Sequence, residues 1–166
     1  MQKGQVAEAM VHYRKLLEIQ PDNSEARNIL GTVLIQQGRA REAIEQWWHE
    51  TLATEPENGN AKSNIAWVFA TCPEATFRDG AKAVQLAEQA LQLSGSKNPL
   101  IFRTLAAAYA ENGRFPEAID TAQRGLDLAN SQGNPGLAAE LQNNIVLYQS
   151  GRPLRDPGLT NRQSLP

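Results

Sequence analysis

The residues of this chain with the greatest potential for chemistry lie in one stretch, WVFATCPEATFRDG, at positions 67–80. It contains Cys72, which is the only cysteine, and the adjacent pair Arg78 and Asp79. A cysteine becomes a nucleophile where a cation or a base stabilises its thiolate, so this stretch could form a small active site. The same residues also suit an oversized turn in which the thiol packs as a small apolar side chain.

The rest of the sequence offers this cysteine no catalytic partner. His12 and His49 lie in other segments and do not have the spacing of metal ligands. A single cysteine excludes an internal disulfide and any zinc site built on cysteine pairs. Neither a phosphate-binding loop nor a paired-carboxylate site is present. We therefore expect no enzyme activity, no cofactor and no metal ion, with Cys72 packed in the turn and Arg78 and Asp79 starting the next helix.

The charge and hydropathy of the chain exclude several classes of partner. Lys and Arg total 16 against 18 Asp and Glu, for a net charge of −2, so no basic field recruits nucleic acid or anionic lipid. No stretch approaches the ~20 apolar residues of a membrane span, and the first residues, MQKGQVAEAM, lack the apolar core of a signal peptide. We expect neither nucleic-acid binding nor membrane insertion of this segment.

The elements that must position these side chains follow from an internal repeat. Four segments align on a shared alanine with steps of 34, 40 and 35 residues, at Ala9, Ala43, Ala83 and Ala118. Three of them are preceded by stretches with apolar residues at helical spacing, namely 24–37, 60–71 and 99–112. A period near 34 residues with this pattern predicts pairs of antiparallel helices joined by short turns.

Local signals support these helix pairs. Asn23 or Ser24, and Asn98 before Pro99, are suitable N-caps. We expect small residues where paired helices approach closely, since larger side chains there would force the helices apart; these are Gly31, Ala66, Ala106, Ala43, Ala83 and Ala118. We expect the turns to contain glycines with positive φ, at Gly38, Gly80 and Gly113.

The order of large and small residues resembles the tetratricopeptide repeat (TPR). The matching positions are Leu30, Gly31, Ala43, Trp47 and Pro56 in one unit, Leu105, Ala106, Tyr109 and Ala118 in another, and Ala9, Tyr13 and Pro21 in a first half unit. The resemblance implies an all-α fold, a right-handed α-solenoid of antiparallel helix pairs with about three and a half repeats. Its expected parts are a TPR array over 1–150 with a half repeat 4–21, repeats 24–56, 58–95 and 99–130 and a capping helix 134–149, followed by an extended or disordered tail over 151–166.

The sequence departs from the repeat pattern in three places. The first unit lacks its first helix, so either the chain is a fragment of a longer array or another molecule covers the exposed face. One extra residue between Ala43 and Pro56 predicts a π-bulge or a longer exit turn. Trp47 is then expected in the core, with Trp48 displaced toward the surface or partly buried. Five extra residues around Cys72 enlarge the next turn, so that a helix ends near Thr71 and the following one begins near residues 78–79.

In the TPR family the first helices of the repeats line a concave groove that binds extended peptides or a partner helix. The candidate groove residues are Asn28, Thr32, Gln36, Asn64, Trp67 and Arg103, with Ile35, Ser63, Thr104 and Ala107 beside them. Asparagine can pair with a peptide backbone, tryptophan offers apolar area, and arginine binds a carboxylate bidentately; alternatively, these are hydrated groove residues. The family's two-Lys, two-Asn, one-Arg carboxylate clamp is not matched, because Asn28, Thr32 and Leu100 replace its residues.

Two functions are predicted from this resemblance. The first is a protein–protein interaction scaffold that binds a peptide or partner helix in the groove. The alternative is a self-assembling array, in which the unpaired N-terminal helix docks on another copy to give a homo-oligomer or filament. The run from Asn64 to Ala129 also resembles the C-terminal arrays of large bacterial TPR proteins. That likeness implies a bacterial source, with the chain in the cytoplasm or on the extracytoplasmic side of a larger protein.

Overall fold

The computed structural model of the chain describes residues 3–37, 39–45 and 51–159, and the described residues form helices and no strand. The helices are α1 (Lys3–Ile19), α2 (Ser24–Gln36), α3 (Ala40–Glu45), α4 (Leu52–Thr54), α5 (Gly59–Thr71), α6 (Gly80–Leu93), α7 (Pro99–Glu111), α8 (Phe115–Ser131) and α9 (Pro135–Gln149). Two short 3-10 turns, η2 (Ala75–Phe77) and η3 (Pro157–Leu159), follow α5 and α9. None of these helices is both long and apolar enough to cross a membrane.

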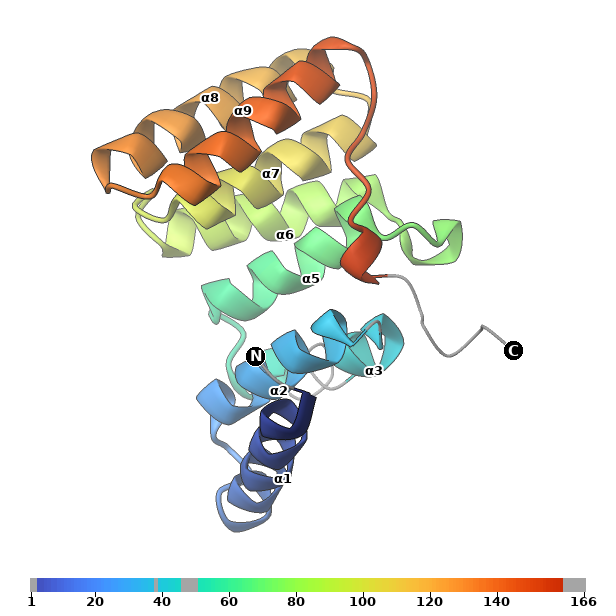
Figure 1. Cartoon of the computed structure of the whole chain (residues 1–166), viewed down its shortest axis with the longest axis vertical. Helices are drawn as coiled ribbons and strands as arrows, with labels where there is room; N and C mark the ends of the chain where they lie inside the picture. The colour runs from blue at the N-terminus through green and yellow to red at the C-terminus, as the bar shows by residue number, and fades with distance from the viewer. Residues whose placement is uncertain (1–2, 38, 46–50, 160–166) are drawn as a thin grey trace.

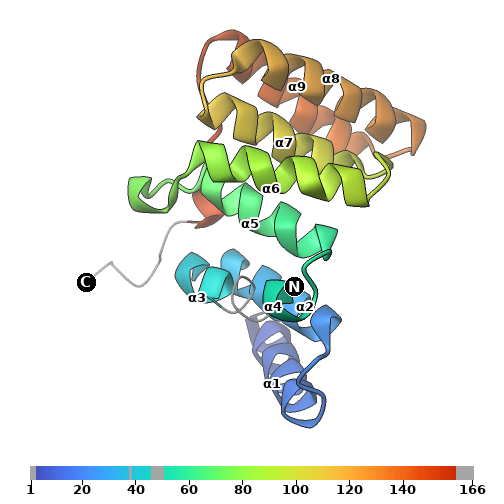
Figure 2. The same ribbon diagram turned by 180° about the vertical axis from the view of Figure 1, so that it is seen from behind.

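The helix pairs stack in chain order along the long axis of the molecule, and α9 lies beside α8 at one end (Figure 1). α5 pairs with α6 and α7 with α8, while α6 packs on α7 and α8 on α9 between successive pairs. The helices α5 and α7 also contact each other directly, and the view from behind shows α6 and α8 on the opposite side of the stack (Figure 2). This arrangement is the all-α solenoid of antiparallel helix pairs that the sequence predicted.

Asparagine caps begin most of the well-formed helices. Each cap side chain accepts a hydrogen bond from a backbone N–H of the first turn, which has no partner within the helix; the caps are Asn23, Asn58, Asn98 and Asn134. Asn23 rather than Ser24 therefore caps α2. The predicted caps at Asn23 and Asn98 are confirmed.

The glycines of the turns have two different roles. Gly113 has φ +76° as predicted, a conformation that costs glycine little. Gly80 does not have positive φ. It begins α6 against the end of α7, where a Cβ atom would lie 3.0 Å from the backbone nitrogen of Asn112. The prediction of a positive φ at Gly80 is therefore wrong. Glycine is required there because the backbones of α6 and α7 approach each other closely. Gly38 lies outside the described residues.

The core between the helices is built largely from alanine. All six small positions that the repeat predicted are buried, with Ala43, Ala66, Ala83 and Ala118 at 0% exposure. Small side chains let the helix backbones approach closely, and larger neighbours fill the remaining space. The apolar side of α9 is buried against α8 and α7, with Leu141 and Tyr148 almost fully enclosed. Asn144 of the same helix is also buried.

The chain continues past α9 and turns back along the stack. After Gly151, which has φ +68°, residues 152–156 run without regular secondary structure and lead into η3. We call residues 152–159 the return segment. It passes from the end of α9 to the end of α5 (Figure 1), so it contacts helices that precede it by many residues. The tail was expected to be extended or disordered, and this part of it packs on the array.

Some sequence predictions fall outside the described residues. Trp47, Trp48 and His49 belong to this group, as do residues 46–50 of the predicted π-bulge or exit turn.

Candidate peptide-binding face

The helices α2, α5, α7 and α9 are the first helices of their units, and we call the side they form the first-helix face. Trp67 of α5 and Arg103 of α7 are in direct contact on this face, with the guanidinium carbon 4.2 Å from the ring centroid. Arg103 Nη1 also lies 2.6 Å from Oε2 of Glu140 on α9. A tryptophan ring attracts a cation placed over it, so three side chains form a row across three successive first helices.

The candidates near Trp67 divide into groove and interior residues. Asn64 lies one turn before Trp67 on α5 and is half-buried. Ser63 and Thr104 are buried, and the two hydroxyl oxygens are 3.2 Å apart between α5 and α7. Ala107 is also buried. The hydroxyls of Ser63 and Thr104 thus form a contact between the two helices, and all three side chains are buried, so the expectation that they line the groove is wrong.

The candidates on α2 form a separate group. Thr32 is exposed, and its hydroxyl donates to the backbone carbonyl of Asn28 at 2.8 Å. The Oδ1 atom of Asn28 is buried and accepts no hydrogen bond from the described residues. Gln36 is the last residue of α2, and its side chain lies outside what the structure describes. The structure thus joins Trp67 and Arg103 directly, and it places Asn28 and Thr32 together on another helix.

Asp156 of the return segment is bound to α5 by two hydrogen bonds. The indole Nε1–H of Trp67 donates to Asp156 Oδ2 at 2.9 Å. The backbone N–H of Asp156 donates to the carbonyl of Thr71 at 2.9 Å. Thr71 is the last residue of α5, and the last carbonyls of a helix find no donor within it. One residue therefore satisfies a half-buried indole donor and a helix-end carbonyl.

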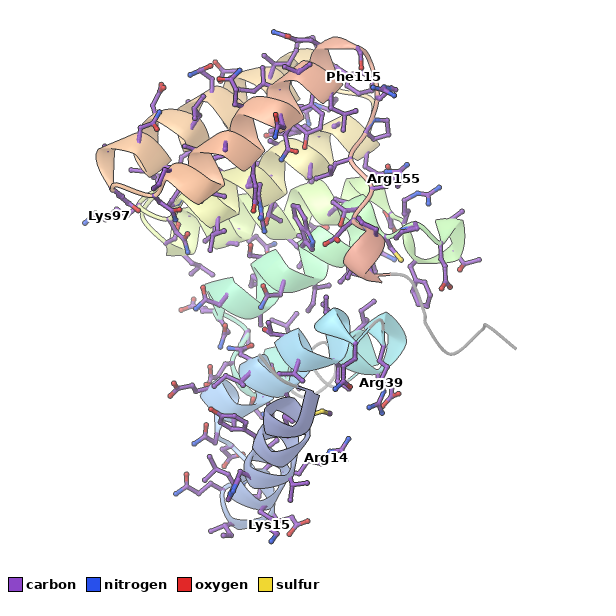
Figure 3. The ribbon with its side chains drawn as sticks, viewed as in Figure 1. Arg14, Lys15, Arg39, Lys97, Phe115 and Arg155 are labelled. Carbon is purple, nitrogen blue, oxygen red and sulfur yellow. The ribbon has the colours of Figure 1, made fainter. Side chains whose placement is uncertain are left out.

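Arg155 lies on the part of the return segment that passes α7 (Figure 3). Its Nη1 atom is 2.7 Å from Oε2 of Glu111, the last residue of α7. Arg78 pairs with the other oxygen of the same carboxylate at 3.0 Å. The Glu111 side chain is only 13% exposed, so its charge is balanced by two guanidinium groups rather than by water.

Leu159 ends the described part of the return segment and is 1% exposed. It packs with Val68 and Cys72 at the end of α5, and Ile35 of α2 and Phe77 of η2 lie against the same cluster. The enlarged turn after α5 therefore supplies part of the wall around this leucine. η3 also contacts α2, so the return segment bridges two first helices.

A pocket of about 340 Å³ remains beside the return segment. Its lining includes the row formed by Trp67, Arg103 and Glu140, together with Asp156. Asn143 and the buried Asn144 of α9 add amide groups to its lining. The Nε atom of Arg103 is buried and donates to no described residue. This pocket therefore offers hydrogen-bonding groups next to an aromatic ring.

Cys72, the candidate nucleophile, is 0% exposed. Burial raises the pKa of its thiol, which keeps the sulfur in its unreactive protonated form. Arg78 Nη1 donates to the carbonyls of Cys72 and Pro73, at 3.0 and 2.8 Å. The prediction that Cys72 packs within the turn is confirmed. No group of three His, Cys, Asp or Glu side chains within 3–37, 39–45 and 51–159 is placed to hold a metal ion.

Asp79 and Arg78 have the structural roles predicted for them. Asp79 caps α6, because its carboxylate accepts from the backbone N–H of Lys82 at 3.0 Å. That hydrogen bond is the main reason why the pKa of Asp79 is lowered. Helix α6 begins at Gly80, slightly later than predicted, whereas α5 ends at Thr71 as expected.

Sequence reasoning missed the residues of the return segment and their partner Glu111. One signal was available: the segment RPLRDPGL alternates prolines with leucines and one charged pair. Proline-rich stretches favour extended conformations that dock on grooves with little loss of entropy. The segment was assigned to the tail because it lacks helical periodicity.

Comparisons with known proteins agree with this architecture. Two family models described as tetratricopeptide repeat match the chain, one over residues 1–46 and the other over residues 75–135. No curated protein matches the sequence. The stacked helix pairs and these two matches define the class, and the chain belongs to the tetratricopeptide repeat family. Repeats of this family are generally protein–protein interaction modules.

Proposed function

We propose that this chain is an interaction scaffold that binds an extended peptide or a partner helix in a concave groove along its first-helix face. One observation supports this proposal most strongly. An extended stretch of polypeptide already lies across this face, held by Trp67 through a side-chain bond and by Thr71 through a main-chain bond. A surface that accommodates one extended chain has the donors, acceptors and apolar area that another requires.

The proposed contacts differ in chemistry along the groove. Asn64 offers amide donors and acceptors to a peptide backbone, and Asn28 and Thr32 extend this polar strip onto α2. Trp67 contributes apolar area, and interface tryptophans often contribute strongly to affinity. Arg103 lines the pocket, and its guanidinium can bind a carbonyl or carboxylate of the partner.

Affinity capture with matched variants tests this proposal. The groove variant is Asn64→Ala combined with Arg103→Ala. The control is Gln123→Ala combined with Asp127→Ala, since these exposed residues of α8 hydrogen-bond to each other at 2.9 Å on the opposite side of the stack. Proteins captured by the immobilised wild type are quantified by mass spectrometry, and each is then titrated as a purified protein against all three chains.

We expect the groove variant to lose affinity by about tenfold or more, as is usual when two central contacts of an interface are truncated. The control should bind like the wild type, because its substitutions leave the first-helix face intact. Partners that bind both variants equally would remove Asn64 and Arg103 from the site and contradict the groove proposal.

Self-assembly through α1 is the alternative function. Val11 and Ile19 of this helix are 52% and 78% exposed, and docking of a second copy would bury such side chains. Light scattering over a range of concentrations, on the wild type and on Val11→Glu, tests it. Concentration-dependent oligomers that Val11→Glu abolishes would support self-assembly, and a monomer at every concentration would exclude it.

A further inference from the structure

We propose that the partner of the groove is an extended peptide that carries a basic residue, an acidic residue directly after it, and a leucine three positions after the acid. We further propose that the return segment, residues 152–159, occupies the site of this peptide in the same chain and competes with it. This inference rests on the proposed function of the first-helix face as a peptide site. The return segment itself contains the sequence Arg155, Asp156 and Leu159 at this spacing.

The acidic position is specified by two groups on α5. The indole N–H of Trp67 needs an acceptor, since a half-buried donor without a partner loses its hydration. A carboxylate is a stronger acceptor than a neutral oxygen because the hydrogen bond is charge-assisted. The carbonyl of Thr71 requires a donor, and the backbone N–H of the same aspartate supplies it at 2.9 Å. One acidic residue in an extended chain thus meets both requirements at once.

The basic position is specified by Glu111. Its carboxylate is largely buried, and Arg78 satisfies only one of its two oxygens at 3.0 Å. The second oxygen lies 2.7 Å from Arg155 Nη1 in an ion pair. When Arg155 leaves, this oxygen loses its paired positive charge in a site with little water. A peptide with a basic residue before its acid replaces the lost contact, whereas an acidic residue there would be repelled.

The leucine position is specified by an apolar pocket and by one turn of 3-10 helix. The pocket is formed by Val68, Cys72 and their neighbours on α2 and η2. The backbone N–H of Leu159 donates to the carbonyl of Asp156 at 3.1 Å, and the N–H of Gly158 donates to Asp156 Oδ1 at 2.8 Å. The aspartate therefore caps the turn that places the leucine, which sets the spacing between acid and leucine.

Because the return segment occupies the site, it competes with a partner peptide and lowers the apparent affinity for that peptide. The segment is tethered to α9 by a few residues, so its effective concentration at the site is on the order of mM. A partner peptide must displace it before binding. If the segment fills the site about nine-tenths of the time, the apparent affinity for a partner falls about tenfold.

The experiment uses the full chain and a labelled peptide, acetyl-RPLRDPGL-amide, which corresponds to residues 152–159. The opened variant combines Asp156→Asn with Leu159→Ser, so that the segment loses its charged acceptor and its buried side chain. Fluorescence anisotropy measures peptide binding to the wild type and to the opened variant. We expect the opened variant to bind about tenfold more tightly or better, because no competing segment fills the site.

Matched peptides and one matched protein variant test the specificity. A peptide with Asn in place of its Asp, and another with Ser in place of its Leu, should each bind at least about tenfold more weakly to the opened variant. Trp67→Phe, introduced into the opened variant, keeps an aromatic ring beneath Arg103 and removes the N–H donor together with part of the ring area. This substitution should lower the affinity for the parent peptide and have little effect on the affinity for the peptide that carries Asn.

Cys72 provides an independent readout, because it lies beneath Leu159 and is the only cysteine. Its reaction with a thiol reagent should be slow in the wild type and faster in the opened variant. The parent peptide should restore protection in the opened variant, whereas the peptide with Ser in place of Leu should not. Circular dichroism melting of each variant confirms that the array is folded.

Three results would overturn the inference. They are equal peptide affinity of the wild type and the opened variant, failure of the peptide to protect Cys72, and a wild-type dimer that dissociates in the opened variant. The last would show that a second copy supplies the segment. Failure of this inference can be distinguished from failure of the proposed function. If captured partners still require Asn64 and Arg103, the groove is a binding site, but its specificity differs from the one proposed here.

Discussion

Gly125 in the middle of α8 provides the most direct test of how tightly this array is packed. A Cβ atom at this position would lie 2.8 Å from Cβ of Phe102 on α7, and 3.4 and 3.5 Å from the two methyl carbons of Leu141 on α9. Favourable carbon contacts are about 3.5–4.0 Å. The Cβ of Phe102 is attached to the backbone of α7, so relief of the clash requires movement of a helix rather than rotation of a side chain.

Two opposing effects determine the result of Gly125→Ala. Alanine stabilises a helix interior by about 1 kcal/mol relative to glycine. Overpacking of a tight contact costs about 1–3 kcal/mol. Because the distance to Phe102 is well below the normal range of carbon–carbon contacts, we expect overpacking to prevail. The expected net loss in the free energy of unfolding is about 1–2 kcal/mol.

Gly136→Ala is the matched control. Gly136 lies in the first turn of α9, and a Cβ atom added there would have Asn134 Oδ1 as its nearest neighbour, at 3.9 Å. With space available and no positive φ, this substitution should stabilise the chain by about 0.4–1 kcal/mol. Urea unfolding followed by circular dichroism measures both variants, and an unchanged slope shows that the same transition is compared. A stabilised Gly125→Ala chain would refute the close α7–α8 packing.

The remaining predictions concern the enlarged turn. Arg78→Ala should cost about 1–3 kcal/mol, because two carbonyls and the largely buried Glu111 lose their donor; Arg78→Lys should recover only part of this in the same unfolding assay. Cys72→Ala should weaken binding of the RPLRDPGL peptide in titrations, because Cys72 forms part of the apolar pocket around Leu159; unchanged affinity of a folded variant would remove Cys72 from that pocket. Asp79→Ala should cost about 0.5–2 kcal/mol, and Asp79→Asn much less, since asparagine also caps. Because the pKa of Asp79 is lowered in the fold, its ionised form stabilises the fold above the unfolded aspartate pKa of about 3.9. The wild-type advantage over Asp79→Ala should therefore shrink, as the pH falls through the lowered folded pKa, to about the advantage of Asp79→Asn, since a protonated carboxyl still accepts through its carbonyl oxygen. A wild-type advantage that does not change with pH would contradict a charged cap.

Much of the fold follows from information that is local in the sequence. The helical spacing of apolar residues, the caps at Asn23 and Asn98 and the small residues at fixed repeat positions each depend on neighbours within one or two turns or on one adjacent helix. The enlarged turn after Thr71 was predictable because an insertion changes a repeat spacing that can be counted. The stacking of successive pairs repeats the same contact, so local patterns were sufficient to define the solenoid.

The candidate site was only partly predictable for the same reason. The repeat register predicted Trp67, Asn64 and Arg103 on first helices, and they lie on α5 and α7, with Trp67 and Arg103 in contact; their role in binding stays a prediction. Asp156 is 89 residues from Trp67 in the chain, and no periodic pattern links the two.

The sequence by itself therefore determined the helices, their pairing and the face that first helices share. Only the tertiary structure decided that Gly80 serves a backbone contact, that Asn144 is buried, and that the return segment lies across the candidate groove. These contacts join elements far apart in the chain, and their energies depend on shape and on unsatisfied polar groups that exist only after the helices have stacked. Local patterns describe the helices well, but they carry no information about which distant segment will satisfy the groups that the helices leave exposed.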